Sequence, residues 1–117
     1  MKEFANKTII GLIEKVTVFG KDDKAKEIAA RIDTGATKGS IDAKLAAELQ
    51  LGPVHKHRIV KSAHGRMLRP VVKVKVKLAG KELESNVTIA DRSHMKYKML
   101  IGQDMLEGFL IDPSKRN

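Results

Sequence analysis

The distribution of apolar and polar residues predicts a chain built mostly from short strands. Alternation with period two is clearest over residues 72–78, where valine and leucine alternate with lysine, as in a strand with one buried face. Apolar and β-branched residues predict further strands over residues 8–18, 28–32, 58–61, 67–69, 83–89, 99–102 and 109–111. Many short strands joined by polar turns are typical of a closed or nearly closed β-barrel.

One helix and one long hairpin complete the predicted elements. Ser40 is a suitable N-cap for the helix, Leu45 and Leu49 share one of its faces, and Gly52–Pro53 stops it. The hairpin has its tip at residues 62–65, where a glycine supplies the positive φ angle that a tight turn requires. A single helical turn is expected over residues 103–107.

Length and composition predict one compact domain over residues 1–117. The chain contains no cysteine, which excludes a disulfide scaffold, a cysteine-ligated zinc site and cysteine catalysis. The first residues lack the apolar core of a signal peptide, and no apolar run reaches the length of a membrane span. We therefore expect a soluble, cytoplasmic protein without membrane contact.

The net charge of +9 favours acidic partners such as nucleic acid or an acidic peptide. Aromatic residues make up only 3% of the chain, which argues against modules that stack bases on exposed rings and makes nucleic acid an unlikely partner. The lysines and arginines are also scattered along the sequence. A solvated basic surface without a dedicated partner is an equally good interpretation of the charge alone.

The candidate chemistry lies in Asp33-Thr34-Gly35, which directly follows an apolar strand. Taken alone, this tripeptide can be an ordinary strand-ending turn. A second element follows much later, where Leu100-Ile101-Gly102 precedes the expected helical turn, and the hairpin lies between the two. Strand, Asp-Thr-Gly, flap-like hairpin, apolar-apolar-Gly and short helix is the order found in retropepsins. The sequence therefore resembles the retropepsin-like aspartic proteases.

A closer resemblance covers nearly the whole chain. It is carried by residues 9–14 (Ile-Ile-Gly-Leu-Ile-Glu), 30–36 (Ala-Arg-Ile-Asp-Thr-Gly-Ala), 69–72 (Arg-Pro-Val-Val), 100–104 (Leu-Ile-Gly-Gln-Asp) and 109–113 (Phe-Leu-Ile-Asp-Pro). These segments resemble the prokaryotic family labelled ATP-dependent zinc protease, which includes the RimB-type retropepsin-like peptidases, and the archaeal branch looks nearest. The resemblance implies peptide hydrolysis. For the RimB type, it implies an oligoglutamate tail on a ribosomal protein as the substrate.

The same resemblance implies a retropepsin-like barrel with one short helix after the Asp-Thr-Gly loop and a flap hairpin. A chain with one such loop holds half of the active site, so the resemblance implies a homodimer in which Asp33 from each copy forms a catalytic dyad. Two adjacent carboxyl groups share a proton, so one can activate water while the other donates to the developing oxyanion. The implied catalytic residues are Asp33, Thr34 and Gly35. The implied substrate contacts are Ala36, Lys38, His64, Gly65, Arg66, Ile101 and Gly102.

Two positions depart from the retroviral pattern. Many retroviral members pair an Asp, two residues after the catalytic glycine, with an Arg after the second glycine; here these positions are Thr37 and Gln103. Asp104 is better interpreted as a helix N-terminal residue than as a second catalytic carboxylate. Lys38, Arg66 and Arg69 could bind glutamate side chains of an acidic substrate, or they could be merely solvated.

Neither metal nor ATP is expected, despite the family label. The four histidines, His55, His57, His64 and His94, form no His-Glu-x-x-His motif and have no cysteine partner. No complete phosphate-binding loop is present. We expect no cofactor. The alternatives to a peptidase are a non-catalytic domain that binds acidic peptides and a nucleic-acid-binding β domain.

Overall fold

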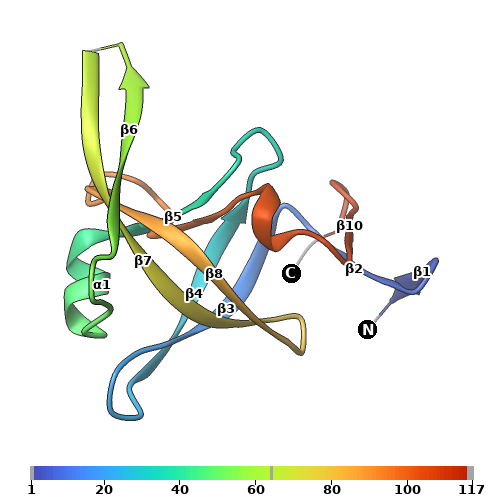
Figure 1. The fold of residues 1–117 in the computed structure, drawn as a ribbon. Coiled ribbons are helices and arrows are strands. Elements are labelled where there is room, and N and C mark those ends of the chain that lie inside the picture. Colours follow the sequence, from blue (N-terminus) through green and yellow to red (C-terminus); the bar gives the residue numbers. More distant parts are fainter. Residues whose placement is uncertain (1, 64, 116–117) are drawn as a thin grey trace.

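The computed structural model describes residues 2–63 and 65–115, and these residues form the mostly β structure that the sequence predicts (Figure 1). In chain order the elements are β1 (Glu3–Phe4), β2 (Lys7–Ile10), β3 (Ile13–Phe19), β4 (Ala25–Ile32), β5 (Gly39–Asp42), α1 (Ala43–Glu48), β6 (Lys56–Ser62), β7 (Gly65–Leu78), β8 (Lys81–Ala90), β9 (Met99–Ile101), the 3-10 helix η1 (Gln103–Met105) and β10 (Phe109–Ile111). No helix of the described residues is both long and apolar enough to cross a membrane.

A closed barrel forms the body of the protein. Its sheet has the strand order β3-β4-β9-β5-β8-β7-β6, and an additional pairing of β3 with β7 closes it and leaves β6 outside. A smaller sheet of order β1-β2-β10 joins the two ends of the chain, because β10 pairs in parallel with β2. The predicted closed, mainly β fold is confirmed.

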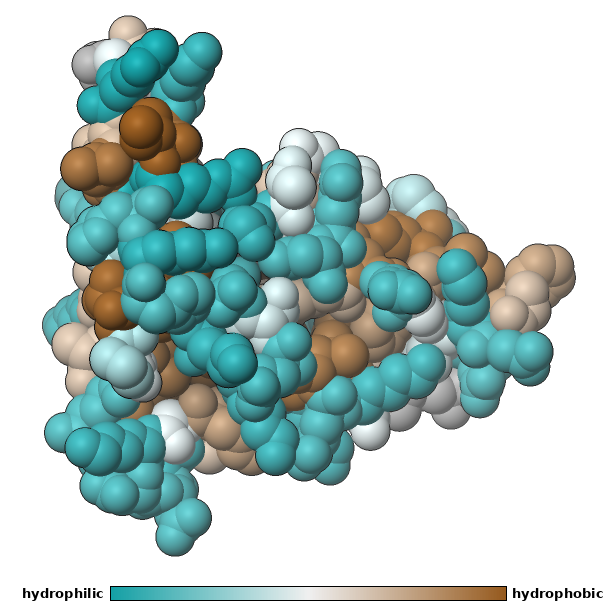
Figure 2. All heavy atoms as spheres, viewed as in Figure 1, coloured by the Kyte–Doolittle hydropathy of each residue, from teal (hydrophilic) through white to brown (hydrophobic). Residues whose placement is uncertain are grey.

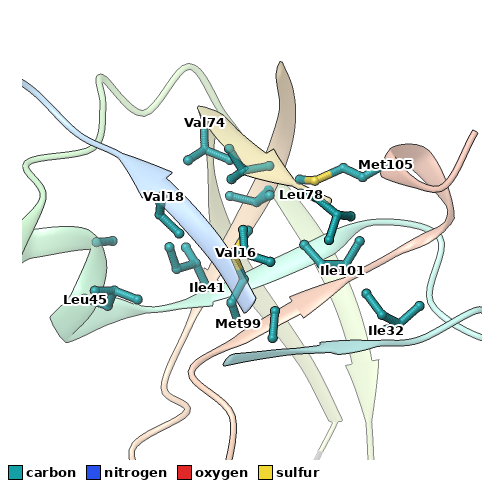
Figure 3. Close-up of a cluster of buried hydrophobic side chains, with 14 of the residues drawn as sticks. Val16, Val18, Ile32, Ile41, Leu45, Val74, Leu78, Met99, Ile101 and Met105 are labelled. Atoms are coloured by element: carbon teal, nitrogen blue, oxygen red, sulfur yellow. The ribbon is translucent and has the colours of Figure 1, made fainter. Parts of the chain in front are cut away.

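Alternating apolar residues fill the barrel (Figure 3). Val74, Val76 and Leu78 of β7 are at most 2% exposed, while the lysines between them face solvent, so one face of the strand is buried as predicted. Residues from distant strands meet these side chains in the centre. They include Val16 and Val18 of β3, Ile41 of β5, and Met99 and Ile101 of β9.

Three predicted boundaries were wrong. The strand expected over residues 8–18 is divided into β2 and β3. The strands expected over 67–69 and 72–78 are one strand, β7, with Pro70 inside it. Pro70 is tolerated because the pairing of β7 with β8 starts only at Val71. Asp42, and not Ser40, caps α1: its carboxylate accepts the backbone N–H of Lys44 at 3.2 Å.

The predicted hairpin is present and projects from the barrel (Figure 1). Strands β6 and β7 pair from Lys56↔Val71 to Ser62↔Gly65. The hairpin carries exposed apolar side chains, among them Ile59, Met67 and Leu68, and Figure 2 shows such a patch on its otherwise hydrophilic surface. We refer to residues 56–70 as the flap.

Candidate active site

The Asp33 loop begins where β4 ends. Ile32 pairs with Ile101 of β9, and the backbone N–H of Asp33 donates to the Ile101 carbonyl at 2.9 Å. The Asp33 Oδ1 atom accepts the backbone N–H of Gly35 at 2.9 Å, and its carbonyl accepts the N–H of Ala36 at 3.3 Å. These bonds form a tight turn that fixes the direction of the half-buried Asp33 side chain.

Gly102 lies directly against this loop. A Cβ atom at this position would stand 2.5 Å from the carbonyl carbon of Lys38, 2.7 Å from its oxygen and 2.9 Å from the carbonyl oxygen of Ala36. All three are backbone atoms, so no side chain can move aside to make room. The two sequence motifs, Asp33-Thr34-Gly35 and Leu100-Ile101-Gly102, therefore lie in loops that pack closely against each other.

Gln103 connects the same two loops by hydrogen bonds. Its side-chain Nε2 donates to the carbonyl of Thr34 at 2.6 Å, and its backbone N–H donates to the carbonyl of Ala36 at 2.8 Å. The next residue continues the connection, since the N–H of Asp104 donates to the carbonyl of Thr37 at 3.2 Å. Sequence comparison marks Gln103 only as a departure from the retroviral ion pair. The structure shows that its amide holds the loop instead.

Replacing Gln103 by Met should loosen the Asp33 loop without unfolding the protein. Methionine keeps the length of the side chain but cannot donate to Thr34, and a hydrogen bond of this kind contributes about 1 kcal/mol. We expect the amides of Gly35 and Ala36 to exchange with solvent about fivefold faster, measured by NMR. Gln103→Arg, which keeps a donor, should preserve slow exchange. Unchanged exchange in Gln103→Met would contradict this role.

Next to the Asp33 loop is a pocket of about 320 Å³ between the flap and the barrel. Five cationic residues line it, Lys38, Arg58, Lys61, Arg69 and Arg92, and none of the described lining residues is acidic. We call this the cationic pocket. It offers positive charge to a ligand that lies between the flap and the Asp33 loop.

Arg92 is the most buried of these cations, with 9% of its surface exposed. Its Nε donates to the carbonyl of Tyr97 at 3.0 Å. Burial lowers the pKa of the Arg92 guanidinium below its ordinary value, and the nearby charge of Arg69 lowers it further, whereas Asp42 and Asp33 oppose this shift. No motif in the sequence points to Arg92.

The structure places some of the remaining predicted site residues near the Asp33 loop and others away from it. Ala36 and Lys38 line the cationic pocket, and Ile101 and Gly102 support the Asp33 loop. Gly65 and Arg66 lie exposed at the tip of the flap, outside this pocket. His64 lies outside the described residues.

The geometry also bears on two alternatives from the sequence, a catalytic role for Asp104 and a metal site. Asp104 lies in the first turn of η1, and its Oδ2 accepts the hydroxyl of Ser85 at 3.1 Å, as suits a helix N-terminal residue. Among residues 2–63 and 65–115, no three His, Cys, Asp or Glu side chains come together to hold a metal ion. His55 instead bonds to Asn86 at 2.9 Å.

One protein-family model matches residues 44–117, more than half of the chain, and it is described as RimB-like: retropepsin-like aspartic endopeptidase RimB. The matched part begins after the Asp33 loop. The match itself does not include Asp33, so the interpretation of Asp33 as a candidate catalytic residue depends on the Asp-Thr-Gly motif and on the loop geometry described above. No curated protein sequence matches the chain.

Solved structures resemble the whole fold. Lpg0085 from Legionella pneumophila, a protein with unknown function, matches with a TM-score of 0.66 and 23% identity over 92% of this chain and 95% of that one. EIAV protease in complex with the inhibitor HBY-793 matches with a TM-score of 0.63 and 16% identity, over 92% of this chain and 91% of that one. The protease of simian foamy virus matches with a TM-score of 0.60 and 17% identity, over 81% and 91%. At these identities the likeness shows the fold.

Proposed function

The chain belongs to the RimB-like family of retropepsin-like aspartic endopeptidases, and from this premise we propose that Asp33 is its catalytic residue and that two copies of the chain form one active site. The observation that carries the proposal is the Asp33 loop itself. It follows β4, whose last residue, Ile32, is buried, is closed by the Gly35 N–H, and is held against Gly102 and Gln103. Such packing keeps a reactive carboxylate in a fixed position.

Two copies are required because the chemistry needs two carboxyl groups. The chain contains one Asp-Thr-Gly sequence, and Asp104, the acidic residue of the second motif, is bonded to Ser85. A homodimer with a two-fold axis near Asp33 brings the two equivalent carboxyls together. The ionised member then takes a proton from water as the water attacks the peptide carbonyl. The protonated member donates to the carbonyl oxygen, where negative charge develops.

Acidic peptides are the proposed substrate class. The cationic pocket lies beside the Asp33 loop and under the flap, so a peptide that reaches Asp33 passes close to it. Glutamate side chains can accept hydrogen bonds from lysine and arginine, and such charge-assisted bonds are stronger than neutral ones. The family resemblance to RimB-type peptidases, whose implied substrate is an oligoglutamate tail, supports the same class.

Cleavage of matched peptides tests the proposal. One peptide carries a run of glutamates, its control carries glutamines at the same positions, and the mass of the protein in solution is measured on the same samples. We expect a dimer that cleaves the glutamate peptide at least about tenfold faster, since each lost charge-assisted contact weakens binding by about 1.5–3 kcal/mol. Equal cleavage of both peptides would contradict the substrate class. Tight binding by a dimer that never cleaves would favour the non-catalytic alternative.

A further inference from the structure

The flap is joined to the barrel over a short stretch only. Strand β6 is the last strand of its sheet, and within the part of the chain that the structure describes it pairs with β7 alone. The pairing of β7 with β8 runs from Val71 to Leu78 and does not include the flap part of β7. The described flap residues, 56–63 and 65–70, are thus held mainly by their own ladder of backbone hydrogen bonds. A hairpin attached in this way can move as a unit relative to the barrel.

The two walls of the cationic pocket belong to these two separate parts. Arg58, Lys61 and Arg69 come from the flap, whereas Lys38 and Arg92 come from the barrel. The cations therefore repel one another across the pocket as well as along the flap. Arg58 and Arg69 are direct cross-strand partners, and like charges in that position destabilise a strand pair. Arg69 also opposes the charge of the buried Arg92.

Each wall also contains a buried polar atom that lacks a hydrogen-bond partner in the described part of the chain. These atoms are the hydroxyl oxygen of Ser40, on the barrel, and Nε of Arg69, on the flap. Ser40 is 7% exposed and lines the pocket together with Arg69. Leaving such groups unpaired is unfavourable, and both can donate to the same acceptor. Buried donors on a positively charged surface are the groups that an oxyanion would satisfy.

We propose that the cationic pocket is an oxyanion site that closes the flap. A carboxylate or phosphate group bound there bridges Arg69 of the flap to Ser40 and Arg92 of the barrel. It removes the repulsion between the two walls and draws the flap onto the barrel. The inference rests on the proposed function in one respect: the closed flap covers the substrate peptide bound at Asp33. An acidic side chain would thereby help to assemble the closed site as well as bind to it.

Hydrogen exchange of the flap amides in the full-length Asp33→Asn protein tests this proposal without any turnover. Exchange over residues 56–61 is compared with inorganic phosphate, with a glutamate tetrapeptide and with sodium chloride of matched ionic strength. We expect phosphate or the peptide to slow exchange about tenfold relative to chloride. If phosphate slows the exchange, a free anion is sufficient to close the flap. Slowing only by the peptide identifies peptide carboxylates as the source. No slowing by either overturns the proposal.

Variants connect the effect to the pocket. Ser40→Ala and Arg69→Gln should each reduce the slowing at least about fivefold, and Ser40→Ala, which removes a single oxygen, keeps the test decisive if Arg69→Gln lowers stability. Lys77→Gln is the matched control, because it removes one charge from an exposed part of β7 outside the pocket. Equal slowing in all variants overturns the proposal. Because Asp33→Asn is used throughout, failure here leaves the catalytic proposal intact, and absence of cleavage in the wild type leaves this one intact.

Discussion

Asp33→Asn should abolish peptide cleavage while preserving the fold. Asparagine has the shape of aspartate and keeps an oxygen that can accept the Gly35 N–H, so the turn should remain. It cannot take a proton from water, and the loss of a general base costs up to about 10⁴-fold in rate. We expect kcat/KM for a glutamate-rich peptide to fall by about 10³-fold or more, measured by chromatography of the products.

The control is Asp104→Asn, which removes a carboxylate on the neighbouring turn that bonds to Ser85. It should retain cleavage within about threefold, because the proton acceptor at the turn after β4, the Asp33 carboxylate, is still present in this variant. The thermal midpoint and the solution mass of both variants should match the wild type. Equal activity of Asp33→Asn and wild type would show that Asp33 is not the base.

Gly102→Ala is expected to have the second largest effect. Its new methyl group would lie 2.5 Å from the carbonyl carbon of Lys38, so the backbone of one loop must move. Inserting atoms into a packed site costs about 1–3 kcal/mol, and displacement of a catalytic group by about 1 Å can cost about 10²-fold in rate. Urea unfolding and kcat measure the two effects separately.

Gly102→Val gives the graded comparison, because the larger side chain should lower both quantities further. Loss of activity should also be accompanied by faster amide exchange at Gly35 and Ala36, the residues that close the Asp33 turn. Wild-type stability and activity in Gly102→Ala would mean that the two loops do not pack as described.

Much of the barrel could be predicted because its strands carry their own pattern. Residues 72–78 alternate strictly, and β7 buries the expected face. The N-cap was harder to predict, since Ser40 and Asp42 are both suitable caps. The choice depends on β5, which extends to Asp42 by pairing with β8 up to Ala90. Such pairing between distant segments cannot be read from local propensity.

The same distinction applies to the site. Asp33 and Gly102 lie in short motifs that the sequence displays, so their proximity was predictable. The Gln103–Thr34 bond joins residues 69 positions apart, and Arg92 enters the site from the segment after β8. Their roles depend on the path of the chain through the barrel, which no local pattern determines.

Strand alternation could have separated the two flap arginines. Arg66 and Arg69 are an odd number of residues apart on β7, so they point to opposite faces of the strand. Only Arg69 lines the cationic pocket. Its cross-strand partner Arg58 also lines the pocket.

Mixing wild-type chains with Asp33→Asn chains tests the central claim most directly. If each active site needs Asp33 from both copies, only homodimers of the wild type cleave, and activity follows the square of the wild-type fraction once mass spectrometry shows that subunits have exchanged. With equal amounts of the two chains we predict about a quarter of the activity of undiluted wild type. Activity that falls in direct proportion to the wild-type fraction would contradict the shared dyad.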